Sequence, residues 1–371
     1  MLAFGTYDVT TQPRVGVLIE GLRDHGVDVV EINRPLGFTT AERVRMLSKP
    51  WLAYRFAFRL LGRWIGLVRG TTSVRRTGRF DAVLVGYLGH FDVVLARLLF
   101  PRTVIALDLM IFAADTARDR DAAGKLKLSL LDALDRLAAS CADLVIVDTE
   151  EQLELLGNGQ RAKGIVVPVG ASRAWFDAAQ DPTAAGSGKL RVVFFGMFTP
   201  LQGTHVIGEA LALLADATAI TVTIIGTGQT YAATRAAAGD RGAIRWFDWV
   251  EPEDLPAVVA AHEVCLGVFG TSNKALRVAP HKIYQGAAAG CSIITSDTPP
   301  QRRALGDAAR YIAPGDPVAL ADALRTLATD EAGARDLRIA ARSVAIKRFT
   351  PMAVVAGLCE RLADMPGDRE T

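Results

Sequence analysis

The sequence lacks several features that would assign a function at once. It has only four cysteines in 371 residues, Cys141, Cys265, Cys291 and Cys359, and none lies close enough to another to form a paired metal-ligand motif. We therefore expect reduced, buried thiols and no metal site. The chain also lacks a stretch of 18 uncharged apolar residues, so no membrane-spanning helix is expected.

Excess charge of one sign is equally scarce. The chain has 42 basic and 40 acidic residues, a formal net charge of +2, which gives no reason to expect nucleic-acid binding. The opening residues, MLAFGTYDV, do not place a basic segment before an apolar one, so we expect no signal peptide and predict a cytoplasmic location. The hydrophobic share of 50% and the length of the chain are typical of two globular domains.

Short apolar runs followed by helical patterns recur along the chain. They predict strands that alternate with helices in parallel sheets buried on both faces. The runs lie at residues 82–85, 103–107, 144–147 and 164–167 in the first half, and at 190–195, 219–225, 264–268 and 291–295 in the second. Ligands of such sheets bind beyond the carboxyl ends of the strands, so the loops there are the places to search.

A small, polar segment, Asp177–Lys189 (DAAQDPTAAGSGK), predicts an interdomain linker. We therefore predict an α/β protein with an N-terminal domain at residues 1–180 and a C-terminal domain at 189–345. Residues 346–371 have a helical pattern, and packing back on the N-terminal domain is one expectation for them.

Three loops that follow predicted strands of the second half contain glycines: FFGMFTPLQG, IIGTGQ and VFGT. Glycine lets a backbone approach a ligand closely, and the helix that follows offers N–H groups to an anion. Ordinary strand-to-helix turns are the alternative, and for IIGTGQ they are the stronger interpretation. The candidate donor-binding residues of these loops are Gly196, Thr199, Gln202, Gly203, Gly226, Gly228, Gly270 and Thr271.

The segment SNKALRVAPHK carries the most chemistry. It supplies Lys274, Arg277, His281 and Lys282 within nine residues, directly before a helical pattern. Cationic groups beside a glycine loop and a helix start suit a diphosphate. Transfer of a sugar from a nucleotide requires such stabilisation of the departing diphosphate. A solvated basic loop is the alternative.

The segments FFGMFTPLQGTHVIGEALALL, IIGTGQ and VCLGVFGTSNKALRVAPHKIYQGAAAGCSIITSD resemble, in order and spacing, the C-terminal half of family 4 (group 1) glycosyltransferases. In the first half, ALDLMIFAADTARDR, LDRLAASCADLVIVDTEEQLELL and IVVPVGASRAWFD resemble a bacterial branch of that family. The resemblance covers nearly the whole chain. It implies the GT-B fold, in which two Rossmann-like parallel-sheet domains face each other across a cleft.

The resemblance also implies a nucleoside-diphosphate sugar as co-substrate in the C-terminal domain and an acceptor in the N-terminal domain. It implies retention of the anomeric configuration and no required metal or other cofactor. In many members a glutamate pair precedes the AxxxG helix, and the corresponding positions here hold Arg277 and Gln285. Gln285 can still contact a donor ribose, as a neutral group. Trp249 and Val250 lie where relatives hold the base, and a buried tryptophan is the alternative.

A second departure concerns the phosphate clamp. Many members carry an arginine and a lysine in the loop after the first strand of the C-terminal domain, and Met197 and Gln202 replace them here. We predict that Lys282 substitutes for the clamp, together with Arg277 or Lys274.

The N-terminal domain offers fewer signals. Asp108 ends one predicted strand, near where the family often carries a histidine, and His90 lies one unit earlier in GYLGHFD; both are catalytic candidates. Arg14 either reaches a phosphate or lies on the surface. Asp115 and Thr116 belong to a post-strand loop, in which Asp119 and Arg120 form an ion pair in the alternative interpretation. The acceptor-binding candidates are Gly5, Thr6, Tyr7, Arg14, Asp115 and Thr116.

Residues 51–69, WLAYRFAFRLLGRWIGLVR, form an amphipathic pattern. Arg55, Arg59 and Arg63 fall on one face at 100° per residue, and apolar residues including Trp64 cover a wide remaining face. A basic face beside an aromatic-rich face is typical of a helix that lies on a membrane surface. A helix packed on the N-terminal sheet is the alternative. Because many relatives glycosylate lipid-linked acceptors, the resemblance supports contact with the inner face of the cell membrane.

We therefore predict a retaining glycosyltransferase of cell-surface glycan biosynthesis. It moves a hexose-type sugar from a nucleoside-diphosphate carrier to a glycan or lipid-linked acceptor. Two alternatives remain: a nucleotide-sugar epimerase, which converts the donor without transfer, and a catalytically silent scaffold of a glycan-assembly complex. The replaced glutamate pair and clamp favour the scaffold.

Overall fold

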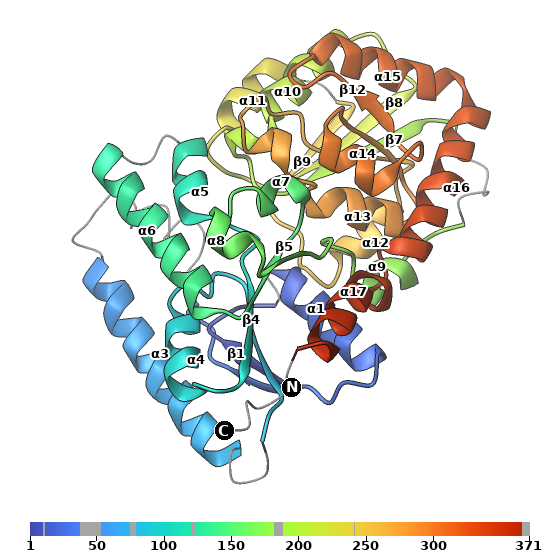
Figure 1. Cartoon of the computed structure of the whole chain (residues 1–371). Helices are drawn as coiled ribbons and strands as arrows, with labels where there is room; N and C mark the ends of the chain where they lie inside the picture. Colours follow the sequence, from blue (N-terminus) through green and yellow to red (C-terminus); the bar gives the residue numbers. More distant parts are fainter. Residues whose placement is uncertain are drawn as a thin grey trace. The chain divides into compact units, whose positions relative to one another are not determined.

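The computed structural model describes residues 1–9, 12–37, 53–74, 79–120, 124–181, 188–240 and 242–365, and these form two compact units. Unit 1 comprises Met1–Val167 and the residues from Val354 on, and unit 2 comprises Pro168–Ala353. Each unit is built on one six-stranded, entirely parallel sheet with helices packed on it (Figure 1).

The boundary between the units lies earlier than the predicted linker. Helix α9 (Arg173–Asp177) belongs to unit 2, where the buried Trp175 stacks on Phe195 with ring centroids 5.6 Å apart. This apolar contact fixes the start of unit 2 ahead of residue 180. Residues 182–187 of the predicted linker lie outside the described residues.

The strands of unit 1 follow the order β2-β1-β3-β4-β5-β6. They are β1 (Leu2–Gly5), β2 (Val30–Asn33), β3 (Ala82–Val85), β4 (Val104–Asp108), β5 (Leu144–Val147) and β6 (Gly164–Val166). The helices are α1 (Pro13–Asp24), α3 (Ala53–Val74), α4 (Asp92–Leu99), α5 (Ala113–Asp119), α6 (Lys125–Cys141), α7 (Glu150–Leu153), α8 (Asn158–Arg161) and α17 (Pro351–Ala363), most of which lies in unit 1.

Three helices share one face of the unit 1 sheet. Alternate residues of a strand point to the same face, and Phe4 and Leu107 pack there against Leu67 of α3, Val93 of α4 and Ala138 of α6. Helix α4 lies between α3 and α6, and Figure 1 shows the three helices along one side of the unit. We call α3, α4 and α6 the helix layer of unit 1.

The strands of unit 2 follow the order β12-β11-β10-β7-β8-β9. They are β7 (Leu190–Phe195), β8 (Ile220–Ile225), β9 (Ile244–Phe247), β10 (Val264–Leu266), β11 (Ser292–Ser296) and β12 (Arg310–Ile312). The other elements are η2 (Pro200–Gln202), α10 (Thr204–Leu213), α11 (Tyr231–Ala238), α12 (Leu255–Ala260), η3 (Ala275–Arg277), α13 (His281–Ala288), α14 (Pro299–Leu305), α15 (Pro317–Thr329) and α16 (Glu331–Arg348).

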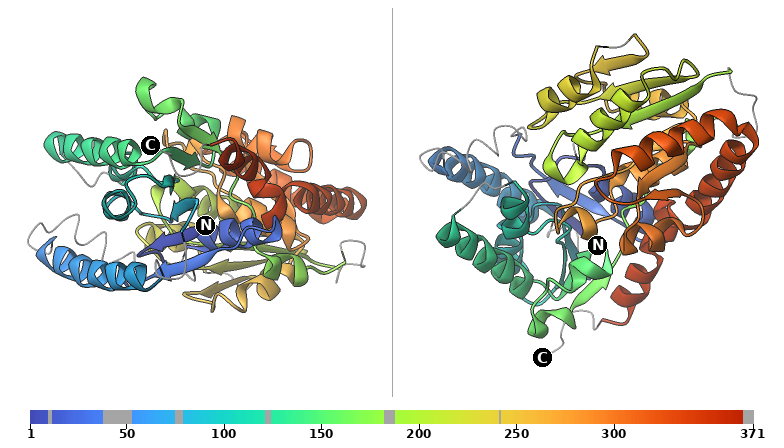
Figure 2. Two further views of the ribbon diagram at one scale, coloured as in Figure 1. Left: turned by 60° about the horizontal axis from the view of Figure 1, so that its bottom comes forward. Right: turned by 90° about the horizontal axis from the view of Figure 1, so that it is seen from above.

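The strand order of unit 2 reverses between β7 and β10. The chain runs from β7 outward through β8 and β9, and then returns to β10 on the other side of β7. Helices cover both faces of the sheet, as the views in Figure 2 show. At such a switch point the loops after the two central strands separate at the carboxyl edge, where ligands of open parallel sheets bind. The loops after β7 and β10 are two of the predicted glycine loops.

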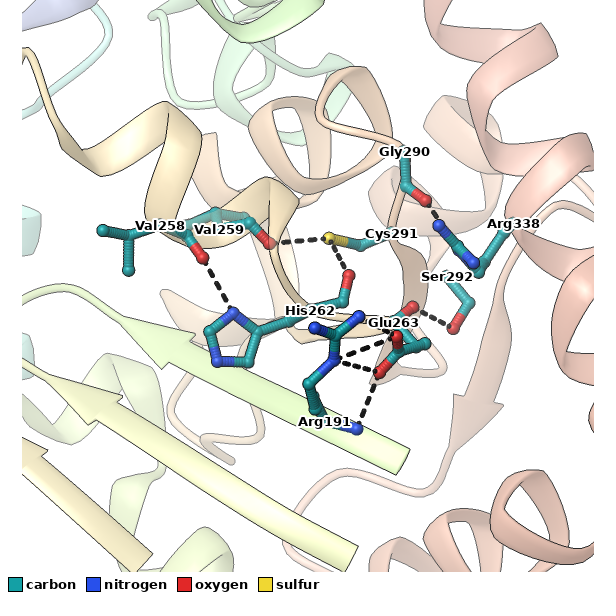
Figure 3. A network of polar contacts seen from close by, with 9 residues as sticks. All are labelled: Arg191, Val258, Val259, His262, Glu263, Gly290, Cys291, Ser292 and Arg338. Atoms are coloured by element: carbon teal, nitrogen blue, oxygen red, sulfur yellow. Dashed lines mark hydrogen bonds and ion pairs between the residues drawn. The ribbon is translucent and has the colours of Figure 1, made fainter. Parts of the chain in front are cut away.

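The opposite edge of the unit 2 sheet holds a polar network (Figure 3). Glu263, just before β10, accepts hydrogen bonds from the backbone nitrogen of Arg191 at 2.8 Å and from its Nε at 3.1 Å. The ring of His262 lies 2.8 Å from the carbonyl oxygen of Val258. Burial alone raises the pKa of Glu263, but the hydrogen bonds and charge of Arg191 outweigh burial and hold that pKa below 4.5. The network therefore favours the ionised carboxylate in the folded protein.

We expect Glu263→Gln to lower the free energy of unfolding by about 1–3 kcal/mol at pH 7, because an amide loses the charge-assisted bonds to Arg191. The Glu263 pKa is lower in the folded protein than in the unfolded chain. Its stabilisation is therefore present above the unfolded pKa of 4.5 and is lost as the pH falls through the folded pKa. Urea unfolding at pH 7 and at about pH 4 should show a difference between wild type and variant that shrinks at the lower pH. A difference that does not change with pH would contradict this account.

Candidate functional site

The three glycine loops of unit 2 pack against one another at the carboxyl edge. A Cβ atom on Gly203, which has a φ of 62°, would lie 2.3 Å from the backbone nitrogen of Gly270. A Cβ on Gly226 would lie 2.1 Å from the carbonyl oxygen of Gly196. A Cβ on Gly228 would likewise clash with the backbone of the loop after β7. Glycine is required at these positions because the loop backbones touch. For IIGTGQ the structure thus favours the turn interpretation.

Lys282 lies against the loop after β7, one of these three glycine loops. It is in the first turn of α13, is only 4% exposed, and places its amino group 3.9 Å from the centroid of the Phe194 ring. The amino group donates a hydrogen bond to the side-chain oxygen of Gln202. A Cβ on Gly196 would meet the same nitrogen at 3.4 Å. Lys282 is therefore no solvated surface lysine, and it joins the ends of β7, η2 and α13.

Within the described residues, Lys282 forms no ion pair with a carboxylate. Its described neighbours are Gln202, Phe194 and Cys265, whose thiol lies 3.6 Å from the Lys282 carbonyl oxygen. Burial lowers the pKa of Lys282 to about 7 and raises the pKa of Cys265 to about 12. An ammonium group without a carboxylate partner gains more from a bound anion than an already paired one.

The other members of the basic cluster lie in the same stretch of chain. Lys274 is buried and Arg277 half-buried beside and within η3, and His281 opens α13. Gln285, predicted at the ribose, is buried one turn after Lys282. Thr271 is exposed directly after the β10 loop. The structure thus brings Lys282 into contact with the β7 loop and places the remaining candidates along η3 and α13.

Two further features of this edge bear on the predictions. Trp249 follows β9 and is 63% exposed, so the buried-tryptophan alternative is wrong; Val250 next to it is half-buried. A network of three threonine hydroxyl groups gave no signal in the sequence. The hydroxyl oxygen of Thr204, at the start of α10, lies 2.8 Å from the hydroxyl oxygens of both Thr230 and Thr234. These hydroxyl contacts link the start of α10, after the β7 loop, to the segment after β8. Thr199, within the β7 loop, is buried.

In unit 1, Asp108 and Arg14 form a fully buried ion pair. Arg14 Nε donates to Asp108 Oδ1 at 2.8 Å, and its Nη2 donates to the carbonyl oxygen of Val167 at 2.9 Å. Burial raises the pKa of Asp108, so its charge depends on the adjacent guanidinium. The surface alternative for Arg14 is wrong. The pair holds α1, β4 and the segment after β6 together, which makes it part of the architecture of the unit.

A second buried carboxylate, Asp92, was missed by the sequence analysis. It accepts hydrogen bonds from the backbone nitrogen and hydroxyl of Thr6, both at 2.8 Å, and from the indole nitrogen of Trp64 at 2.9 Å. Tyr7 is buried next to it, and a Cβ on Gly5 would lie 3.2 Å from the Tyr7 ring. Trp64 was predicted to contact a membrane, but the structure turns it toward the N-terminus of α4.

His90 is bound to a carboxylate as well. Its Nε2 lies 2.8 Å from Oδ1 of Asp135 in α6, and the same oxygen accepts a hydrogen bond from the backbone nitrogen of Ala113 at 2.9 Å. Asp135 therefore both orients the imidazole and caps α5. Asp115 and Thr116 were predicted on a loop, but they lie within α5, where Asp115 is buried. Of the two catalytic candidates, His90 follows the carboxyl end of β3 and Asp108 is the last residue of β4.

The described segments contain no group of three or more His, Cys, Asp or Glu residues that could hold a metal ion. All four cysteines are unpaired thiols.

Comparison with known proteins assigns the second half of the chain. Residues 189–330 match the family model for group 1 glycosyl transferases. These residues form a group 1 glycosyltransferase domain. The domain contains every strand of the unit 2 sheet and the whole of the loop assembly around Lys282. It thus confirms the resemblance of this half of the chain. A search of curated proteins finds no match to the sequence.

Solved structures resemble the chain over nearly its full length. They include a sucrose-phosphate synthase from Thermosynechococcus elongatus (TM-score 0.68, 15% identity, covering 98% of both chains). The HepE protein of Anabaena in complex with UDP-glucose has a TM-score of 0.67 at 14% identity and covers 98% of this chain and 99% of its own. An alpha,alpha-trehalose-phosphate synthase (UDP-forming) from Burkholderia vietnamiensis has a TM-score of 0.66 at 13% identity, with 98% and 96% covered. These likenesses, together with the two parallel sheets, confirm the predicted GT-B fold class.

We expect Arg14→Ala to lower the free energy of unfolding by about 3–5 kcal/mol, because it leaves the Asp108 carboxylate buried without a partner. The double variant Arg14→Met, Asp108→Leu should regain most of this loss, since neither charge then remains. Urea unfolding followed by circular dichroism measures both. Unchanged unfolding of Arg14→Ala would show that the pair does not hold unit 1 together.

Proposed function

We propose that this chain transfers a sugar from a nucleoside-diphosphate sugar, which it binds at the carboxyl edge of the unit 2 sheet. The observation that carries the proposal is the buried Lys282 amino group, which contacts Gln202 and has no carboxylate beside it among the described residues. The match of residues 189–330 to group 1 glycosyl transferases supports this placement of the donor.

The chemistry follows from where charge develops. The bond between the anomeric carbon and the diphosphate oxygen breaks, an acceptor hydroxyl bonds to that carbon, and its proton goes to the departing diphosphate when configuration is retained. Negative charge therefore grows on the diphosphate in the transition state, and cationic groups that meet it there raise turnover. Lys282 is the main such group, with Arg277 or Lys274 assisting, since Met197 replaces the usual arginine. No metal or other cofactor enters this proposal.

The donor is a UDP-sugar in the first instance. HepE is described in complex with UDP-glucose, and the trehalose-phosphate synthase is named as UDP-forming. The exposed indole of Trp249 offers an aromatic surface beside the base position, and a planar base gains free energy by stacking on such a ring. Gln285 donates to or accepts from the ribose hydroxyls.

The acceptor is a glycan or lipid-linked precursor of the cell surface, and it binds at the carboxyl edge of unit 1. Candidates there are the Thr6–Tyr7 segment and His90, which Asp135 orients. Peripheral attachment to the cytoplasmic face of the cell membrane brings the protein to such an acceptor. No helix in the described part of the chain is long and apolar enough to cross a membrane.

We expect Lys282→Ala to reduce kcat roughly a hundred- to a thousandfold, because one charge-assisted contact to the developing diphosphate is worth about 3–4 kcal/mol. The assay measures release of UDP from UDP-sugars in the presence of glycan acceptors. Lys274→Ala and Arg277→Ala, the two assisting candidates, are compared with it, each variant at an unchanged melting temperature. Near wild-type turnover of Lys282→Ala would sink the assignment, and a collapse of Arg277→Ala alone would move the phosphate contact to that residue.

The same assay, run over a range of pH, tests the role of the Lys282 charge and distinguishes transfer from the alternative functions. Because the pKa of Lys282 is about 7, the ammonium form is lost above that pH, and kcat/KM for the donor should fall as the pH rises past it. Lys282→Ala should lack this fall.

Conversion of the donor sugar without an acceptor would point to an epimerase. Absence of any nucleotide release or binding by the wild type would point to a silent scaffold.

A further inference from the structure

The apolar residues of α3 divide into two faces. Leu60 and Leu67 are buried and turned toward the sheet, as expected of a packed helix. The stripe on another face is 54–80% exposed and consists of Tyr54, Phe58, Leu61 and Ile65. These four positions fall within about 60° of one another at 100° per residue. Helix α3 therefore packs on the sheet with one face and exposes an apolar stripe on another.

Helix α6 carries a matching stripe with the same spacing. Leu126, Leu130, Ala133 and Leu137 are all exposed, whereas Ala139, on the opposite face, is buried in the core. A surface helix of a soluble domain normally places polar residues on its solvent side. Exposed apolar stripes on two helices of one layer are therefore unusual.

The two stripes belong to one surface of unit 1. Helices α3 and α6 pack on the same face of the sheet with α4 between them, and α4 exposes Leu98. Phe56 of α3 contacts Phe91 at the start of α4 with ring centroids 5.6 Å apart. The helix layer of unit 1 thus has apolar stripes on its solvent side, held in place by a packed core.

The charges of this layer are predominantly positive. Helix α3 contains four arginines and no acidic residue. Both acidic residues of α6 are already engaged, Asp132 with Arg118 at 2.9 Å and Asp135 with His90 at 2.8 Å. The exposed basic residues of the two helices are Arg55, Arg59, Arg69, Lys125 and Arg136.

We propose that the exposed stripes of α3 and α6 together form one surface that binds an anionic lipid bilayer. Apolar side chains would enter the boundary between headgroups and acyl chains, while the arginines and lysines meet lipid phosphates. The proposal extends the membrane attachment of the proposed function from one helix to two, and adds the α6 stripe as an essential half. The absence of exposed acidic side chains on α3 and the paired acids of α6 favour a bilayer over a protein partner of mixed charge.

The test is flotation of the full chain with vesicles of phosphatidylcholine containing about 30% phosphatidylglycerol, compared with pure phosphatidylcholine. We expect binding to the anionic vesicles to be stronger, and to fall with rising salt. The variant Leu126→Ser, Leu130→Ser should lower the partition coefficient about tenfold or more, because it removes half of the α6 stripe. The matched control is Val318→Ser, Ile346→Ser, which alters two comparably exposed apolar residues of unit 2 and should leave binding unchanged.

A second variant, Arg55→Glu, Arg59→Glu, should abolish the preference for anionic vesicles without altering α6. Wild-type binding that the α6 variant does not weaken would confine attachment to α3 and overturn the two-helix surface. Absence of vesicle binding by the wild type would overturn the proposal. Self-association of the wild type in analytical ultracentrifugation, lost in the α6 variant, would assign the stripes to a second copy of this chain instead. Release of UDP from soluble substrates, measured without vesicles, reports separately on the proposed function.

Discussion

The unit 2 site depends on a buried lysine amino group that has no carboxylate partner among the residues the structure describes. Taking Lys282 out of water disfavours its charge, as its pKa of about 7 shows. This desolvation cost falls at the carboxyl edge of the sheet, where α13 contacts the β7 loop and Gln202. In the sugar-transfer account, the missing negative charge arrives with the substrate. The tight backbone packing of the glycine loops keeps the amino group in place before the substrate binds.

The two edges of the unit 2 sheet differ in how their charged groups are paired. At the amino-terminal edge, Arg191 and Glu263 satisfy each other, and His262 is bound to the backbone. At the carboxyl edge, the Lys282 amino group is bound to the neutral side chain of Gln202 and forms no ion pair within the described residues. A protein that held an equally satisfied network at both edges would gain stability but lose the electrostatic preference for a diphosphate. Unit 1 places a buried ion pair at its carboxyl edge, where Asp108 is bound to Arg14.

Much of the fold could be predicted from the sequence, because the central strands are continuous apolar runs. Strands β2, β9 and β12 escaped the analysis, and all three lie at sheet edges, where exposed residues such as Arg245 and Arg310 interrupt the apolar pattern. The position of α9 was also missed, since only the contact of Trp175 with Phe195 assigns it to unit 2.

The site was predictable in part and for a physical reason. Lys282 stood out because a basic cluster precedes a helix, but its burial depends on loops that lie 80 residues away in sequence. Asp92 and Asp135 gave no signal, since each pairs with residues from distant elements. For α3 the periodicity gave the width of the apolar face, and only the fold showed that one part of it packs on the sheet while another remains exposed.

The central claim is that the donor diphosphate binds the loop assembly around Lys282. Hydrogen–deuterium exchange of the full chain, measured with and without UDP, tests it most directly. The account predicts slower exchange in residues 196–203 and 270–285, with little change in unit 1. Protection confined to unit 1, for example around Thr6 and His90, would contradict it.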